Sequence, residues 1–474
     1  MQRRMRAPAI DFAQLRRDMG IAGEFSAEAQ QQAAAAVDRF ADARVDRTDL
    51  ELVTIDPPGS MDLDQALRVI RADDGGFLVH YAIADVAALV EPGSALDLET
   101  RRRGQTVYFP DGSVPLHPRA LSEGAGSLLP DQRRAAVLWT ADVAVDGQCR
   151  GVEVSRALVR SRARLDYAGV MADLSADRLH PAIAALPDFG RTRLAWSLAR
   201  GAVQLDLPDQ EIVPHTEPGR AWTLRMAPRT PADQWNAQVS LLIGMCAGRI
   251  QNDAGIGLLR TLPPASTEAV EDLRRAAAHL GIEWRDGLSP GEFLATVEPD
   301  APTTLALMTV GARLMRGAGY LSLAGESSAL PAERREHAGV GGLYAHVTAP
   351  LRRLGDRYAT EVALAVTAGA EVPTWVREVL PELPKTMSGS DSVAATAERK
   401  SIDLTEAVVL SDQVGRRFDA VVMRGADGRR PPEIFIESPA IVARCENAPA
   451  AGTPCTVEVV TADPAVPEVS FRAV

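Results

Sequence analysis

The sequence predicts an α+β protein that has a short helical N-terminus, a large mixed body and a small C-terminal β-barrel of the OB type. Three changes of pattern along the chain predict this architecture. Strong helix formers dominate the first fifty residues, and alternating strand-like runs begin at about residue 51. The last sixty residues return to short alternating runs separated by turn signals, at the spacing of a small barrel.

Residues 1–50 are predicted to form a helical lead-in module. The run "DFAQLRRDMG" (11–20) ends in glycine, and "SAEAQQQAAAAVDRFADARV" (26–45) opens with a serine N-cap and continues through strong helix formers. The segment is too short to be more than a small module.

Residues 51–411 are predicted to form the mixed body. "ELVTI" (51–55) is predicted as a strand, "DPPGS" as a turn, and residues 66–90 as two β-rich runs joined by Asp-Asp-Gly-Gly. A turn-rich stretch at 91–135 is followed by strands at 134–145 and 152–164. Helices are expected to dominate from 165 to 375, and "MSGSDSVAATAERKS" (387–401) is predicted as a loop that leads into a helix. Residues 412–474 form the predicted barrel.

The composition is that of an ordinary globular protein, with 46% hydrophobic and 24% charged residues. No apolar run reaches the roughly 18 residues of a membrane span, and no apolar stretch follows the basic N-terminus as a secretory signal would require. The four cysteines lie far apart without CxxC spacing, which indicates reduced structural thiols in a cytosolic protein and no zinc site. We therefore expect a cytoplasmic protein that does not bind a membrane.

The net charge of −12 argues against a simple nucleic-acid coat protein, which would usually be basic. Only Lys385 and Lys400 are lysines, so arginine supplies the other 49 of the 51 cationic side chains. Genome base composition alone is the explanation of this bias that we favour. An acidic exterior around an arginine-lined channel is the alternative, because arginine forms bidentate contacts with phosphate.

The run "IDPPGSMDLDQAL" (55–67) gathers three carboxylates, Asp56, Asp62 and Asp64, around a turn and follows them with Gln65. Carboxylates placed this close repel one another unless protons or cations neutralise them. Oxygen ligands without a neighbouring His or Cys suit Mg²⁺, whereas the EF-hand spacing that Ca²⁺ would favour is absent. A solvated acidic turn remains open on spacing alone.

The run "TIDPPGSMDLDQA" (54–66) resembles the signature of the RNase II/RNase R (RNB) family of 3′-to-5′ exoribonucleases. Residues 79–139 are similar to the family's next segment, and "HAGVGGLYAHVTAPLRRLGDR" (337–357) resembles its His-x-Thr-x-Pro-x-Arg-Arg motif. "AERKS" (397–401) resembles the segment before its C-terminal RNA-binding domain. These motifs recur in the family's order over about 350 residues.

The resemblance implies an RNB-type catalytic body, catalytic Mg²⁺ and single-stranded RNA as substrate, hydrolysed to 5′-mononucleotides. Asp56, Asp62 and Asp64 would surround the metal, with Asp64 also catalytic. Arg352 would lie beside the scissile phosphate and Glu398 near the terminal nucleotide. The remaining implied RNA contacts are Tyr167 and Arg353 in the body and Arg416, Arg417 and Phe418 in the barrel.

Gln65 departs from the family pattern, in which an aspartate usually stands at this position. An amide offers a carbonyl oxygen to a metal but carries no charge, so the site holds three negative charges instead of four. Our hypothesis is that Gln65 is a neutral ligand and that the enzyme requires more free Mg²⁺. The alternative is an RNA-binding regulator with impaired hydrolysis. Because fifty helical residues cannot form two barrels, we expect the chain to lack the family's N-terminal cold-shock domains, and we expect a monomer that binds no nucleotide cofactor.

Overall fold

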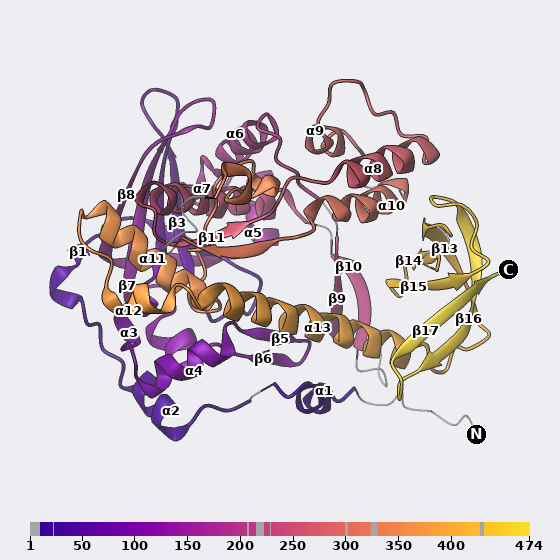
Figure 1. Cartoon of the computed structure of the whole chain (residues 1–474), viewed down its shortest axis with the longest axis horizontal. Coiled ribbons are helices and arrows are strands. Elements are labelled where there is room, and N and C mark those ends of the chain that lie inside the picture. Colours follow the sequence, from indigo (N-terminus) through magenta and orange to yellow (C-terminus); the bar gives the residue numbers. More distant parts are fainter. Residues whose placement is uncertain are drawn as a thin grey trace.

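The structure is a computed structural model of the 474-residue chain, and it describes residues 10–21, 23–205, 208–214, 222–227, 229–298, 302–323, 330–426 and 431–474. A mixed body occupies one side of the molecule and the terminal barrel the other, as Figure 1 shows. One long helix, α13 (Leu383–Leu410), runs from the body to the barrel.

The body is built on a sheet whose strand order is β1-β8-β2-β3-β4-β7, with β7 and β8 also paired to each other. The strands are β1 (Val45–Asp46), β2 (Leu52–Ile55), β3 (Gln65–Arg71), β4 (Phe77–Ala84), β7 (Arg133–Val143) and β8 (Cys149–Leu165). Because β8 pairs with both β2 and β7, the sheet curls around a core in which Tyr81 and Trp139 are fully buried. The predicted strands at 51–55, 134–145 and 152–164 are confirmed.

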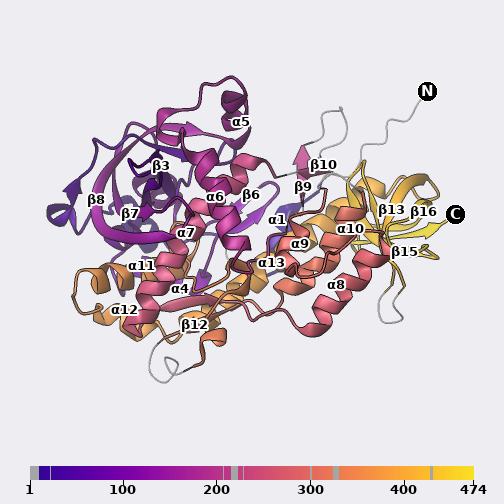
Figure 2. The same ribbon diagram turned by 90° about the horizontal axis from the view of Figure 1, so that it is seen from above.

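Helices cover the inner face of this sheet (Figure 2). The central one is α7 (Pro231–Ala254), which begins with a capping box between Thr230 and Asp233 and buries Trp235 and Val239 against the sheet. Its neighbours are α5 (Tyr167–Ser175), α6 (Leu186–Leu198) and α11 (Leu354–Thr367). α8 (Thr267–His279), α9 (Pro290–Leu294) and α10 (Pro302–Gly311) form a separate group with its own apolar cluster.

Short elements complete the body. They are α3 (Val86–Leu89), α4 (Ala95–Arg103), α12 (Thr374–Val379) and the strand pairs β5–β6 (Val107–Phe109, Gly112–Val114), β9–β10 (Asp209–Pro214, Trp222–Ala227) and β11–β12 (Leu258–Thr261, Gly319–Ser322). Helix α4 lies within the stretch predicted to be only turn-rich. Ser94 caps it, its Leu, Glu and Arg residues are good helix formers, and buried Asp97 and Thr100 pack it against the body, so the turn signals on either side concealed a helix that the local sequence favours.

The prediction of a loop at 387–401 is wrong, because this segment lies inside α13. Its buried positions, among them Met387, Ser390, Ala397 and Ser401, recur at helical spacing, so packing overrides the low helix propensity of Ser and Gly. Small side chains are needed here. A Cβ atom on Gly104 would lie only 2.7 Å from Ser390 Oγ.

The N-terminal segment is less helical than expected. α1 (Phe12–Asp18) and α2 (Ala27–Ala34) are present, but the chain after α2 contains only a 3₁₀ turn before β1. Buried ion pairs of Arg44 with Asp38 and Asp85 hold it in this irregular path.

The C-terminal barrel is confirmed. β13 (Arg417–Arg424), β14 (Glu433–Ile436), β15 (Ile441–Glu446), β16 (Pro454–Asp463) and β17 (Glu468–Ala473) close in the order β13-β14-β15-β17-β16 around Phe471 and Val422. Among the described residues, no helix is both long and apolar enough to cross a membrane.

Candidate active site

The carboxylate run forms the connection between β2 and β3. β2 ends at Ile55, and the loop returns to β3 at Gln65. Two hydrogen bonds fix the end of the loop: the Leu63 N–H donates to Ser127 Oγ at 3.0 Å, and the Ala84 N–H donates to the Asp64 carbonyl at 2.9 Å. The aspartates are therefore held at the end of the sheet by the backbone rather than displayed on a free turn.

A second loop, residues 348–353 before α11, faces the first. The Leu351 N–H donates to Asp64 Oδ1 at 2.7 Å, and Arg352 Nε lies 3.4 Å from Asp64 Oδ2. Fully buried Asp356 holds this second loop, because it accepts the Ala349 N–H at 2.7 Å and pairs with Arg353 at 2.8 Å. Two motifs that lie far apart in the sequence are thus brought together at one carboxylate.

Burial makes these carboxylates hard to ionise. It raises the pKa of Asp64 to about 8 and that of Asp56 to about 6, and the charge of Arg352 only partly opposes the effect. Asp56 Oδ2 is buried and has no hydrogen-bond partner. An unsatisfied acceptor of this kind is uncommon in a folded protein and indicates a position that a ligand would occupy.

Gln65 and Asp62 complete the oxygen set. Gln65 Nε2 donates to the Thr348 carbonyl, which leaves Gln65 Oε1 as the atom that could face a cation. Asp62 accepts a hydrogen bond from the Tyr108 hydroxyl at 3.3 Å. Within the described ranges, no three carboxylate, imidazole or thiol side chains lie close enough together to form a metal site. The donor set nevertheless fits a hard divalent cation, because it is all oxygen and includes the unsatisfied Asp56 Oδ2.

These residues open into a cavity of about 670 Å³. Of the sequence-predicted site residues, it is lined by Asp56, Gln65, Tyr167, Arg352 and Arg353. The Tyr167 hydroxyl accepts from Asn236 Nδ2 at 3.3 Å, so α7 fixes the ring at the cavity wall. The cavity wall thus combines the Asp56 carboxylate with the two arginines and an aromatic ring.

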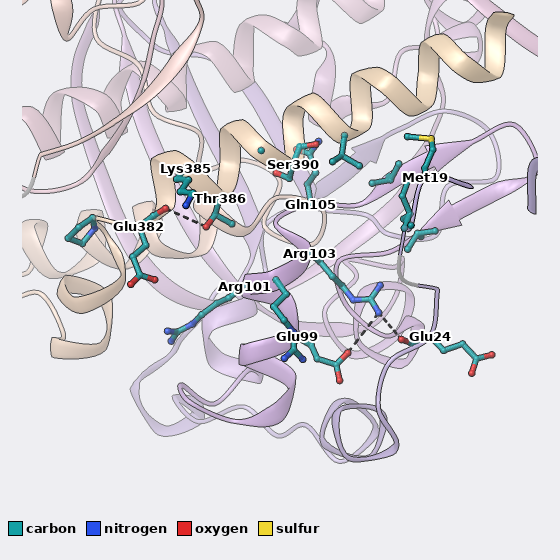
Figure 3. Close-up of a pocket in the computed structure, with 18 residues that line it drawn as sticks. Met19, Glu24, Glu99, Arg101, Arg103, Gln105, Glu382, Lys385, Thr386 and Ser390 are labelled. Carbon is teal, nitrogen blue, oxygen red and sulfur yellow. Dashed lines mark hydrogen bonds and ion pairs between the residues drawn. The ribbon is translucent and has the colours of Figure 1, made fainter. Parts of the chain in front are cut away.

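A larger cavity of about 1060 Å³ lies between α4, α13 and the segment after α1 (Figure 3). None of the predicted metal ligands lines it. Its arginines are engaged locally: Arg101 pairs with Asp97 at 2.6 Å, and Arg103 contacts Glu99 and donates to the Glu24 carbonyl, as Figure 3 shows. The smaller cavity is the candidate active site because it is lined by Asp56, whose Oδ2 is unsatisfied, and by Arg352, which contacts Asp64.

The structure places the other predicted residues outside this cavity. Glu398 is exposed on α13, seven residues after Asp391 and therefore on the same helix face. Asp391 pairs with Arg260 at 3.0 Å. In the barrel, Arg416 lies 5.1 Å from the Phe418 ring centroid, and Arg417 is 3.4 Å from Glu458. The assigned roles of these residues remain predictions.

Sequence reasoning did not identify Thr348, the Leu351 N–H, Asp356 or Tyr108 as parts of the site. Asp356 lies in the quoted motif "LRRLGDR", so the sequence could have indicated it. A backbone N–H could not be recognised, because every residue except proline has one. Arg156 does not contribute a free cation to the site, because it pairs with buried Asp85 and Glu361. Trp235 is buried in the core.

Comparisons with known proteins find matches for both the body and the barrel. The family described as "RNB domain" matches residues 44–366, and the "RNase II-type exonuclease C-terminal S1 domain" matches residues 416–474. Ribonuclease R of Escherichia coli strain K12 is 30% identical over 404 residues, which cover 80% of this chain and 48% of that protein. The chain thus spans about half the length of the curated relatives it matches.

Solved structures show the same fold. Mycoplasma genitalium RNase R in complex with ribose-methylated single-stranded RNA has a TM-score of 0.85 at 18% identity, covering 98% of this chain and 77% of that one. Yeast Ssd1, described as a pseudonuclease, has a TM-score of 0.68 at 16% identity, covering 85% of this chain and 50% of that one. The fold is therefore shared by a nuclease and by a protein described as lacking that activity.

Proposed function

The chain belongs to the RNB domain family, and on this basis we propose that it hydrolyses single-stranded RNA from the 3′ end and releases 5′-mononucleotides. One observation carries the proposal: Arg352, which lies 3.4 Å from Asp64, lines a cavity together with Tyr167 and with Asp56, whose Oδ2 is unsatisfied. Poorly neutralised carboxylates in a cleft are a common mark of a catalytic site.

Asp56, Asp62, Asp64 and Gln65 would hold Mg²⁺. When bound, the metal would supply an activated water and stabilise the leaving oxygen. Arg352 would neutralise the non-bridging oxygens of the scissile phosphate, and its 46% exposed side chain leaves it free to reach them. The Leu351 N–H would keep Asp64 in a fixed orientation throughout.

Single-stranded RNA would follow the cavity toward these groups. The Tyr167 ring would stack on a base, and Glu398 and Arg353 would contact the last nucleotides. The barrel residues Arg416, Arg417 and Phe418 would bind the incoming strand. RNA bound to the structurally similar Mycoplasma RNase R supports this assignment of partner. We further propose that the protein acts in the cytoplasm as a monomer.

A catalytically impaired RNA-binding regulator is the second candidate. Gln65 is the observation that favours it, because the amide removes one negative charge from the proposed metal site. The likeness of the fold to the pseudonuclease Ssd1 is consistent with it. The presence of Asp56, Asp62, Asp64 and Arg352 favours the enzyme.

A time course on 5′-labelled single-stranded RNA, with free Mg²⁺ varied, separates the two candidates. The nuclease produces a ladder that shortens from the 3′ end, and the Asp64→Asn variant does not. The amide oxygen that this substitution introduces can still accept the Leu351 N–H, so the variant keeps the fold and serves as the matched control. RNA binding without shortening at any Mg²⁺ concentration would establish the regulator instead. A DNA oligomer of the same base sequence tests whether the protein requires ribose in its substrate.

A further inference from the structure

Two cysteines that lie far apart in the sequence meet at the junction of the sheet with α7. Cys149 is the first residue of β8, Cys246 lies on α7, and their sulfur atoms are 3.5 Å apart. The barrel cysteines differ, because the Cys445 thiol donates to the Glu446 carbonyl at 3.4 Å and not to another sulfur. All four cysteines are free thiols, as expected for reduced residues, but Cys149 and Cys246 form a contact that their spacing in the sequence did not indicate.

A buried cation lies near enough to this thiol pair to interact with it electrostatically. Arg193 on α6 is 1% exposed, donates to the Gly147 carbonyl at 2.6 Å and lies 4.1 Å from the Trp196 ring centroid. Its Nε has no hydrogen-bond partner, and none of the ion pairs among the described residues includes it. A buried guanidinium without a carboxylate is strongly unfavourable unless another anion compensates it. Cys149 and Cys246 are the groups whose charge would stabilise Arg193.

The two thiols are not equivalent. The hydrogen bond from Cys246 lowers the pKa of Cys149 to about 7, with help from Arg193 and Arg249 and against the effect of burial. The same hydrogen bond and burial raise the pKa of Cys246. Cys149 is partly exposed, whereas Cys246 is buried. As a neutral thiol Cys149 donates to the Gly151 carbonyl at 3.4 Å, and that contact is given up on ionisation.

We propose that Cys149 and Cys246 form a redox-reactive pair, in which a hydroperoxide oxidises Cys149 and Cys246 then closes a disulfide. The Cys149 thiolate attacks one peroxide oxygen and breaks the O–O bond, giving a sulfenic acid and an alkoxide or hydroxide that takes up a proton. The Cys246 sulfur then attacks the Cys149 sulfur and expels hydroxide, which leaves as water with the Cys246 proton. The two sulfurs together give up the two electrons that reduce the peroxide.

The disulfide would join the start of β8 to α7. The N-terminal half of α7 supplies Asn236, Gln238 and Ser240 to the cavity wall, so the cross-link would fix the helix that carries these side chains. This inference does not depend on the proposed function, because it concerns only the thiols and Arg193.

The first test treats the full chain with hydrogen peroxide, labels the remaining thiols with an alkylating reagent and identifies the linked peptides by mass spectrometry. We expect a Cys149–Cys246 disulfide that dithiothreitol reverses, while Cys445 and Cys455 remain alkylated. Four alkylated cysteines after peroxide, or earlier oxidation of Cys445 or Cys455, would overturn the proposal. Cys246→Ser should instead accumulate the Cys149 sulfenic acid, detectable with a dimedone probe.

The second test measures the role of the buried cation. Arg193→Gln should lower the rate of Cys149 alkylation by iodoacetamide at pH 7 about 10-fold, because less thiolate is present. Arg249→Gln changes an exposed side chain on the same helix as Cys246, so it keeps the fold and should lower the rate by a smaller factor. Equal rates for Cys149 in the wild type, Arg193→Gln and Arg249→Gln would contradict the proposal.

The third test measures the effect of the cross-link on the body. Oxidation should raise the midpoint of thermal unfolding by about 5 °C, because the disulfide closes a long loop. The same peroxide treatment should leave the midpoint of Cys149→Ser unchanged. An equal rise of the unfolding midpoint in Cys149→Ser would mean that oxidation of other residues causes the stabilisation.

Discussion

Two buried aspartates of this protein are neutralised in different ways. Asp85 is 3% exposed and lies between two cations, Arg44 at 2.8 Å and Arg156. Asp64 is 2% exposed, but its nearest cation, Arg352, is 3.4 Å away, and burial raises its pKa. The comparison shows that this fold can supply close partners for a buried carboxylate. The site around Asp64 leaves part of that charge for a ligand to neutralise.

The largest expected effect comes from Arg352, the cation that lies beside Asp64. Arg352→Ala should lower the rate of RNA hydrolysis by about 10³-fold, because the charge on the transferring phosphate loses its arginine. Single-turnover kinetics at saturating RNA measure this rate. The unfolding midpoint should change little, because Arg352 is 46% exposed.

Arg353→Ala is the neighbouring control. It leaves Asp356, which is fully buried, without its cation, so it should lower the stability of the fold. If Arg352→Ala reduced stability as much as Arg353→Ala and left the rate unchanged, the two arginines would have been assigned the wrong roles.

The second prediction tests Asp85, the aspartate that two nearby cations neutralise. Asp85→Asn removes the anion between Arg44 and Arg156, and it should lower the free energy of unfolding by about 3 kcal/mol, because two buried cations lose their shared partner. Urea denaturation measures the change. Asp64→Asn should leave the stability at neutral pH unchanged or raise it, since burial already disfavours the charged form. A similar loss in both variants would remove the distinction between the two aspartates.

The sequence predicted some of the groups around Asp64 and missed others. Asp56, Asp62, Asp64, Gln65 and Arg352 were identifiable because their side chains stand in ordered motifs. The Leu351 N–H that binds Asp64 was not, because a backbone group has no residue signature.

The fold was predicted where local pattern and packing agree, as in β2, β7, β8 and the terminal barrel. It was missed in α4, where neighbouring turn signals outweighed a run of good helix formers, and in the first half of α13, where Ser and Gly favour a loop but packing, such as that of Ser390 against Gly104, imposes a helix. The Cys149–Cys246 contact was missed because it depends on how β8 packs against α7.

The third effect concerns a carboxylate between the body and the barrel. Glu406 on α13 accepts from Gln210 at 2.8 Å and from the Val442 N–H at 3.2 Å, and burial raises its pKa to about 7. Since the folded state keeps this proton up to about pH 7 and the unfolded chain releases it near its ordinary pKa of 4.5, stability should fall as the pH rises between these values.

Glu406→Gln keeps both acceptor contacts and should remove this pH dependence. The variant should match the wild type near pH 4.5 and exceed it by up to about 3 kcal/mol above pH 7, at about 1.4 kcal/mol per pKa unit. Denaturant unfolding at several pH values measures the difference. Glu378→Gln makes the same change at an exposed position of α12 and should follow the wild type throughout. A constant difference between Glu406→Gln and the wild type would rule out titration of Glu406 as the cause.

The smallest effect concerns Gln65, whose amide donates to the Thr348 carbonyl and adds no charge to the site. Gln65→Asp should lower the free Mg²⁺ needed for half-maximal hydrolysis about 10-fold, because a fourth carboxylate strengthens cation binding. In EDTA the same variant should be less stable than the wild type, since a carboxylate cannot donate to Thr348 and is repelled by Asp56 and Asp64. Added Mg²⁺ should therefore raise its unfolding midpoint more than that of the wild type.

Gln65→Ala separates these two causes, because it loses the hydrogen bond to Thr348 without adding a charge. It should be destabilised in EDTA but gain no extra stability from Mg²⁺. If Gln65→Asp and Gln65→Ala responded alike to Mg²⁺, position 65 would lie outside the cation's coordination. The charge of Asp64 would then be offset by Arg352 rather than by a cation bound at position 65.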